Sequence, residues 1–333
     1  MLKLQRIFML VFLLLMSSPL IIDAHVKWFT EVEAQKALIE DILSPFFIAL
    51  SLLIALLLAI LTQVLPYLDK VQSLKKIDHK LDQYRKSSRY ILKYGTALAL
   101  VIQIFSGSLF APEFAIPNQI VLITMWAITI LLFIPHHLAT KAGALALLFL
   151  FIYQLTLSGT FHMLDYGFYL AIIAVLLLEK TDLEEWGFPF LYLGTGLSLC
   201  WVAAEKWVYP VMSINIIENH GVPTFGFPPE TFIVLAAFIE FVVGYLLIVG
   251  ILNRLLAFVL TLIFISTTML FGYTEVVGHF IIHIILIIFI IEGVSFYQPP
   301  IRIHKTKIDQ MVFVFLNFIF VLSTFVLIYY RFA

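Results

Sequence analysis

Long apolar runs separated by short polar stretches fill most of this 333-residue chain. A run of about 17–25 mostly apolar residues is long enough to cross a bilayer as a helix. The pattern predicts about ten such spans, and the fifth is short enough to be tilted, half-inserted or merged with its neighbour. The predicted ranges are 44–65, 90–111, 116–135, 143–159, 166–178, 188–209, 231–251, 255–271, 276–294 and 311–330.

The composition agrees with an all-α, polytopic transmembrane helical bundle. Hydrophobic residues make up 62% of the chain and charged residues 12%, a balance outside the range of soluble globular domains. The net charge of −1 argues against a nucleic-acid partner. Cys200 is the single cysteine, so the chain forms no internal disulfide. Any redox chemistry would therefore need a cofactor, a metal or a partner protein.

The first 24 residues have the pattern of a signal peptide. Lys3 and Arg6 precede an apolar stretch, 7–16, and Ala24 ends a plausible cleavage site. An uncleaved anchor is the alternative. Cleavage would leave His25 first, ahead of an external segment, 25–43, and its amine and ring nitrogen would form a copper-binding chelate. The alternative is that His25 marks only the cleavage site.

Basic residues predict the orientation in the cell membrane. Cytoplasmic loops carry an excess of Lys and Arg. The loop between the first two spans holds Lys70, Lys75, Lys76, Lys80, Arg85, Lys86 and Arg89. Counting spans onward places further basic residues on that side: Lys141, Lys180, Arg254, Arg302, Lys305 and Lys307. We therefore expect both mature termini outside.

Ionisable residues inside apolar spans are candidates for function, because burying them in hydrocarbon costs several kcal/mol unless they are paired or hydrated. Glu240 lies at the centre of one span, and Glu205 and Lys206 lie near the outer end of another. An interhelical pair between Lys206 and Glu240, or a proton shared between Glu240 and a histidine, would explain them. Such groups would supply protons to a quinone, and a static interhelical hydrogen bond is the alternative.

Four histidines are candidate metal ligands near the outer face. His279 and His283 are four residues apart and share one helix face, and His25 and His162 belong to the same predicted layer. Imidazole suits copper and zinc. The alternative is that these rings hydrogen-bond to neighbouring helices.

Several motifs between 188 and 294 resemble the DoxX family of four-helix membrane proteins. The stretches that carry the resemblance are Gly194-Thr195-Gly196, Glu205-Lys206-Trp207, Phe238-Ile239-Glu240 with Gly244 and Gly250, Arg254, and Glu275-Val276-Val277-Gly278-His279. Glu205 departs from the pattern, because the family has a small residue before the lysine. The resemblance implies a C-terminal four-helix unit, 188–294, after N-terminal transmembrane helices, 44–178, and before a last helix, 311–331.

The resemblance implies that the protein is a membrane subunit. Members of the family are linked to thiosulfate oxidation with quinone as the electron acceptor, or belong to membrane-associated thiol redox complexes. Three interpretations follow. The first is a redox-associated subunit with a quinone or copper/zinc site, the second is a transporter or metal-handling permease, and the third is a structural or assembly subunit. For the first, we expect Glu240, Lys206 and Glu205 in proton chemistry and Arg254 at the cofactor. A thiol-bearing or electron-transfer protein would be the partner within the lipid bilayer.

Overall fold

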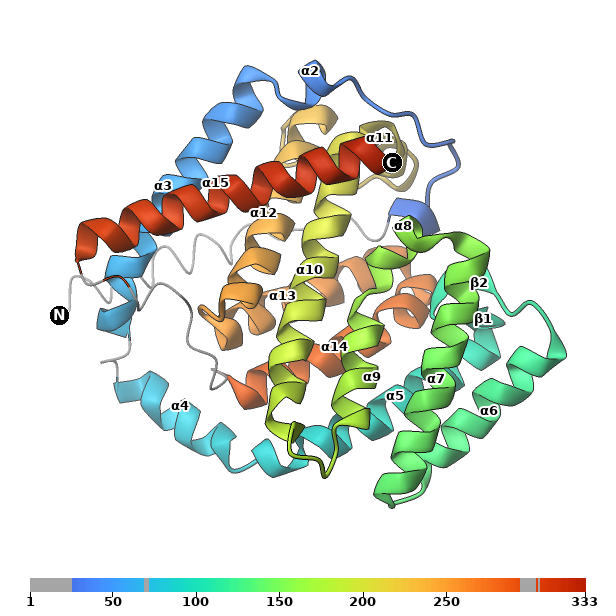
Figure 1. Ribbon diagram of the computed structural model, residues 1–333. Helices are drawn as coiled ribbons and strands as arrows, with labels where there is room; N and C mark the ends of the chain where they lie inside the picture. The colour runs from blue at the N-terminus through green and yellow to red at the C-terminus, as the bar shows by residue number, and fades with distance from the viewer. Residues whose placement is uncertain (1–25, 69–71, 294–303, 305) are drawn as a thin grey trace.

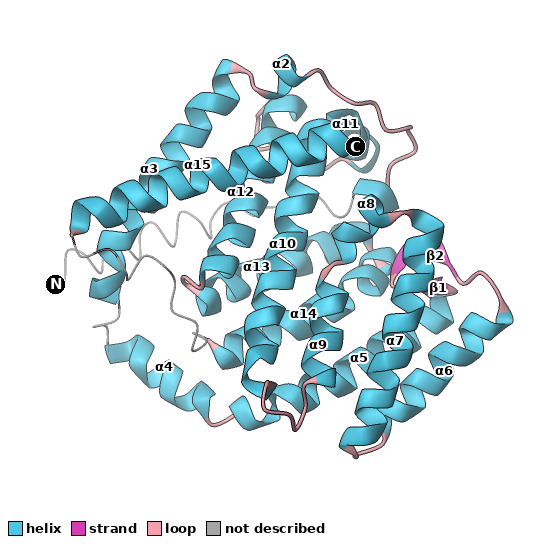
Figure 2. Ribbon diagram, in the orientation of Figure 1, coloured by secondary structure: helices cyan, strands magenta, loops and turns pink. Residues whose placement is uncertain are grey.

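The computed structural model describes residues 26–68, 72–293, 304 and 306–333. The predicted signal peptide and His25 lie outside this part of the chain. The chain folds as a helical bundle, coloured by sequence in Figure 1 and by element type in Figure 2. Its elements are η1 Val26–Trp28, α2 Ile39–Ile42, α3 Pro45–Leu68, α4 Gln72–Asp82, η2 Arg85–Ser87, α5 Ser88–Ser106, β1 Ser108–Leu109, β2 Ala111–Ala115, α6 Gln119–Phe133, α7 His137–Ser158, α8 Thr160–Met163, η3 Leu164–Tyr166, α9 Phe168–Leu177, η4 Glu184–Trp186, α10 Gly187–Val208, α11 Pro210–His220, α12 Pro229–Val249, α13 Asn253–Phe271, α14 Tyr273–Glu292 and α15 Lys307–Phe332.

Each predicted span corresponds to helix in the structure, which confirms the polytopic helical class. Among the described residues, seven helices are long and apolar enough to cross a membrane: α3, α7, α10, α12, α13, α14 and α15. The short fifth span joins α8 and η3 to α9 across a 66° bend and would make an eighth, while α6 is shorter than the others. The predicted count of about ten is therefore not confirmed.

The second predicted span, 90–111, ends earlier than expected. Helix α5 stops at Ser106 because Gly107 adopts a left-handed conformation with φ of 73°. The chain then forms an antiparallel hairpin in which Ser108 of β1 pairs with Ala115 of β2. Helix α6 starts after Asn118, whose side chain accepts a hydrogen bond from the Val121 amide at 3.0 Å. This hairpin brings an acidic residue, Glu113, to one end of the bundle.

Helices α10, α12 and α14 form the centre of the bundle. Between 61% and 67% of their most apolar stretches is buried, against 22–28% for α3, α13 and α15, whose exposed apolar faces suit lipid contact. A Cβ atom on Gly196 of α10 would lie 2.6 Å from the carbonyl oxygen of Gly244 on α12. Only glycines permit so close a crossing, and it places the polar residues of α10 beside α12.

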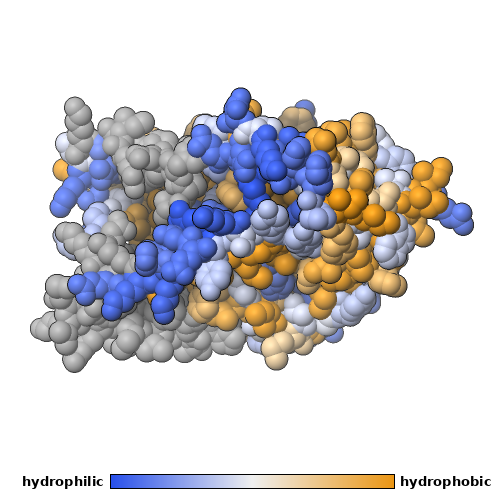
Figure 3. Space-filling view, turned by 90° about the horizontal axis from the view of Figure 1, so that it is seen from below, coloured by the Kyte–Doolittle hydropathy of each residue, from blue (hydrophilic) through white to orange (hydrophobic). Residues whose placement is uncertain are grey.

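The two ends of the bundle differ in composition. At the α8 end, α10 and α13 finish and α12 and α14 begin (Figure 1). At the α4 end, the amphipathic helix α4 lies beside the last turn of α14, where Arg85 donates a hydrogen bond to the Glu292 carbonyl at 2.7 Å. Seen from below, this face gathers hydrophilic residues over its centre and hydrophobic residues on its flank (Figure 3).

Candidate functional site

The site begins with an ion pair between the two central helices. Lys206 Nζ on α10 lies 2.7 Å from Glu240 Oε2 on α12, and the two side chains are 0% and 7% exposed. The sequence suggested this pair as one explanation of the two residues, and the structure contains it. A buried pair of this kind holds its partners firmly, since removing one partner leaves the other charge buried and uncompensated.

A second pair lies on the first turns of α14. Glu275 and His279 are four residues apart, so their side chains meet on one helix face, and Glu275 Oε2 pairs with His279 Nδ1. Both side chains are buried. The His279 ring packs between Trp28, at 4.8 Å between ring centroids, and Phe264 of α13, at 4.6 Å. The carboxylate and the two aromatic rings fix the orientation of the imidazole.

A lysine from the N-terminal segment, residues 26–38, reaches two further carboxylates. Lys27 Nζ lies 2.5 Å from Asp165 Oδ2 of η3 and 3.1 Å from Glu205 Oε1 of α10. Burial by itself would lower the pKa of Lys27, but the charges of Asp165 and Glu205 outweigh burial and raise the pKa above its ordinary value. Lys27 is therefore held as an ammonium ion.

A third group surrounds the carboxylate of Glu113 on the hairpin. His162 Nε2 lies 3.0 Å from Glu113 Oε1, and the Tyr166 hydroxyl donates to the same oxygen. Burial would raise the pKa of Glu113, but these two hydrogen-bond partners and the charge of Lys27 lower it below its usual range. Trp28 Nε1 donates to the Tyr166 hydroxyl at 2.9 Å, which connects this group to the N-terminal segment.

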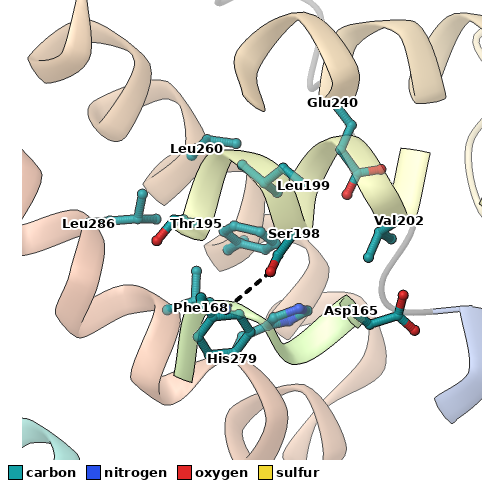
Figure 4. Close-up of a pocket in the computed structure, with 12 residues that line it drawn as sticks. Asp165, Phe168, Thr195, Ser198, Leu199, Val202, Glu240, Leu260, His279 and Leu286 are labelled. Carbon is teal, nitrogen blue, oxygen red and sulfur yellow. Dashed lines mark hydrogen bonds between the residues drawn. The ribbon is translucent and has the colours of Figure 1, made fainter. Parts of the chain in front are cut away.

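A cavity lies among these groups, with about 500 Å³ of empty space when its open part is included. Glu240, His279 and Asp165 contribute polar groups to it, and its other walls are largely apolar. Figure 4 shows the Glu240 carboxyl entering from one side and His279 from the opposite side, with Asp165 next to the N-terminal segment. The hydroxyl of Thr195 also lines the cavity and has no hydrogen-bond partner among the described residues. As it stands, the cavity can hold only a few water molecules. A larger ligand could bind only if the walls moved apart.

Carboxylates outnumber the basic side chains at this end of the bundle. In the described part of the chain, the ion pairs at this end join five acids to four basic side chains. The acids are Glu113, Asp165, Glu205, Glu240 and Glu275, and the basic side chains are Lys27, Lys206, His162 and His279. Buried oxygens of three of the acids, Asp165 Oδ1, Glu205 Oε2 and Glu275 Oε1, accept no hydrogen bond from the described residues. Buried charges are normally paired, so this surplus suits the uptake of protons or of a cation.

The predicted metal ligands are not gathered into one set. His279 pairs with Glu275 and His162 with Glu113. His283 lies one turn deeper, with its ring 6.1 Å from that of Phe264, and His25 is outside the described residues. No group of three or more His, Cys, Asp or Glu side chains suited to a metal ion occurs in the described ranges, so copper or zinc binding stays a prediction.

Arg254, the predicted cofactor-binding residue, lies at the α4 end. Its guanidinium donates to the carbonyls of Ile290 and Ile291 at 2.8 and 2.9 Å and pairs with Asp78 and Asp82 of α4. It does not line the cavity. The structure therefore separates Arg254 from Glu240, Lys206 and Glu205, which it brings to the α8 end.

Sequence reasoning did not select Lys27, Trp28, Glu113 or Glu275 as site residues. Glu275 could have been found, because it lies four residues before His279 on the same helix. Glu113 occupies a short polar interruption between two predicted spans, which is a weak signal. Lys27 and Trp28 stand in a polar segment with no periodic pattern, and their partner residues are 138 positions away in the chain.

Comparison with known proteins identifies one segment. Residues 194–273 match the DoxX family model, which takes in Glu205, Lys206, Glu240 and Arg254 and stops before His279. Searches of curated proteins and of solved structures found no match. The chain is thus a multi-pass membrane protein, and the segment that matches the DoxX family model contributes part of the cavity wall and the Lys206–Glu240 pair.

Proposed function

We propose that the protein is a membrane redox-associated subunit that binds a quinone or quinol at the cavity. The observation that carries the proposal is the meeting of Glu240, His279 and Asp165 on walls that are otherwise largely apolar. An apolar slot with a few convergent polar groups is typical of a small-molecule site. A quinone ring is flat and apolar, with an oxygen at each end that accepts or donates a hydrogen bond.

The titratable groups would handle protons, and a partner would handle electrons. Oxidation of a quinol to a quinone releases two protons and two electrons. Glu240 and His279 would exchange the protons with the ring oxygens. Cys200 is buried and donates to the Phe241 carbonyl at 3.5 Å, so an electron-transfer or thiol-bearing protein would take the electrons.

Quinone binding to the purified protein tests this proposal. Quinones quench tryptophan fluorescence, and the Trp28 ring packs on His279, which lines the cavity. Titration with a short-chain benzoquinone should quench this emission saturably. Glu240→Gln and His279→Ala should each weaken binding by about tenfold, the equivalent of about 1.4 kcal/mol.

The matched control is Glu230→Gln, since Glu230 is an exposed carboxylate on the first turn of α12. Its affinity for the quinone should equal that of the wild type. Quenching that does not saturate, or that is unchanged in Glu240→Gln and His279→Ala, would contradict a quinone site.

The surplus of carboxylates supports one other candidate, a transporter for a cation. In that case the acids at the α8 end would form a binding site along a pathway. Reconstituted vesicles distinguish the two. Uptake of a cation that is abolished by Glu240→Gln, without any quinone binding, would favour transport over redox chemistry.

A further inference from the structure

The N-terminal segment supplies a side chain that behaves as a ligand of the bundle. Lys27 lies between Asp165 and Glu205, at 2.5 and 3.1 Å, while its own side chain is 20% exposed. The two carboxylates come from η3 and α10, so they are positioned by the bundle and not by the segment. Their side chains are 0% and 2% exposed.

Without Lys27, these two acids would have to bind another cation or take up a proton. Two buried carboxylates that approach one ammonium group repel each other, and burying a charge without a partner is very costly. Asp165 Oδ1 and Glu205 Oε2 accept no hydrogen bond from any described residue. They are therefore acceptors for further N–H donors, which a primary ammonium group has and a sodium ion lacks.

Trp28 packs against the cavity wall beside this position. Its ring packs on His279, and its indole N–H donates to Tyr166. The ring also lies against Gly278 so closely that a Cβ atom there would be 2.0 Å from it. Glycine at 278 thus leaves the space that Trp28 fills, and the segment covers a residue of the cavity wall.

The rest of the segment is held more loosely. Residues 29–38 form no regular secondary structure, and most of them are exposed. The backbone contacts are few: the Glu31 amide donates to Asn215 at 3.0 Å and the Ala37 amide donates to the Val208 carbonyl at 2.9 Å. Segments with few buried contacts open at low free-energy cost. Phe29 packs on Phe271 and Lys36 donates to the Tyr330 carbonyl, but Lys27 and Trp28 are the residues of the segment that contact Asp165 and His279 of the cavity wall.

We propose that Asp165 and Glu205 form a binding site for a primary ammonium group, and that Lys27 is its tethered occupant. When Lys27 leaves, Trp28 leaves with it and uncovers His279, a residue of the cavity wall. A soluble alkylammonium ion takes the vacated position. This site goes beyond the proposed quinone function and does not depend on it.

Chemical rescue of a truncated lysine tests the site. The variant Lys27→Ala, purified in detergent without any quinone, should unfold at a lower temperature than the wild type. Ethylammonium chloride at millimolar concentration should restore at least half of the lost stability. Ethanol and sodium chloride at the same concentration should restore none, because they lack the ammonium donors. The wild type should not respond to ethylammonium.

Lys36→Ala is the matched control. Lys36 belongs to the same segment but donates to the Tyr330 carbonyl at the surface, so its loss should give no response to ethylammonium. Adding Asp165→Asn to Lys27→Ala should abolish the rescue, because one of the two charges that bind the ammonium group is then gone. A Lys27→Ala protein as stable as Lys36→Ala, or one that responds equally to ethanol, would overturn the proposal.

A second experiment covers a Lys27→Ala variant that does not fold in plain buffer. The protein is then extracted in ethylammonium chloride and, in parallel, in sodium chloride. Recovery of folded protein only with ethylammonium supports the site, and recovery in neither salt overturns it. Both experiments read stability without quinone, so a failed quinone titration leaves their outcome unaffected.

Discussion

At the α8 end, the side chains of Asp165 and Glu205 are 0% and 2% exposed, whereas at the α4 end those of Asp78 and Asp82 are 52% and 45% exposed. Both sets of acids pair with a cation, Lys27 in the first case and Arg254 in the second. The buried acids lie beside a cavity, while the exposed acids lie on a surface helix. An exposed ion pair contributes little, whereas removing one partner of a buried pair leaves an uncompensated buried charge. Substitutions are therefore expected to have larger effects at the α8 end than at the α4 end.

The largest expected effect is on the activity of reporter fusions, which shows which end of the bundle faces the outside of the cell. Described basic residues such as Lys76, Lys80 and Arg85 lie at the α4 end, so we expect this end in the cytoplasm. Alkaline phosphatase fused in the loop 211–229 should be active, and fused in 68–88 it should be inactive. The opposite pattern of activity would place the cavity on the cytoplasmic side and exchange the roles of the two ends.

The second effect concerns the buried pair of the α8 end. Lys206→Ala leaves the Glu240 charge uncompensated between α10 and α12, so we expect a loss of about 3–5 kcal/mol in the free energy of unfolding. Thermal and denaturant unfolding in detergent measures it. The double variant Lys206→Met with Glu240→Leu removes both charges and should recover most of the loss. A double variant as unstable as the single one would show that packing, and not charge, holds this position.

The third effect is a pH dependence at the edge of the same cluster. The pKa of Glu113 is lowered in the folded protein, so its ionised form stabilises the fold at pH above about 4.5, the ordinary value. This stabilisation is lost as the pH falls through the lowered folded-state pKa. Glu113→Gln should therefore cost about 1.5–3 kcal/mol at pH 7, the contribution of hydrogen bonds to a charged group. It should also flatten the stability profile in acid. Parallel profiles for the variant and the wild type would contradict this assignment.

These comparisons indicate which parts of the molecule can be predicted from sequence. The helices were predictable, because a helix that crosses a bilayer needs a long apolar run such as that of α12. The Lys206–Glu240 pair was predictable as an alternative, because two charges in neighbouring spans have few other partners. The end of α5 was not, since the left-handed Gly107 leaves no hydrophobic signal.

The N-terminal part of the site was beyond prediction for a different reason. Lys27 pairs with Asp165, and Trp28 contacts Tyr166, only because the segment folds back over the ends of the helices. No periodicity marks such a contact, and lysine and tryptophan are ordinary residues in an external segment. Positions of this kind depend on tertiary packing alone.

The smallest expected loss in the free energy of unfolding is at the α4 end, and measuring it tests the contrast between the buried and the exposed ion pairs. Replacing Asp78 and Asp82 by Asn removes the charge partners of Arg254, but its guanidinium keeps the carbonyls of Ile290 and Ile291. Because both acids are half-exposed, we expect a loss of at most about 1 kcal/mol, which 1 M salt should mask by screening the wild-type pairs. Unfolding at low and high salt measures both. A loss as large as that of Lys206→Ala would mean that the surface helix α4 holds the bundle as strongly as the buried pair does, and exposure would no longer separate the two ends.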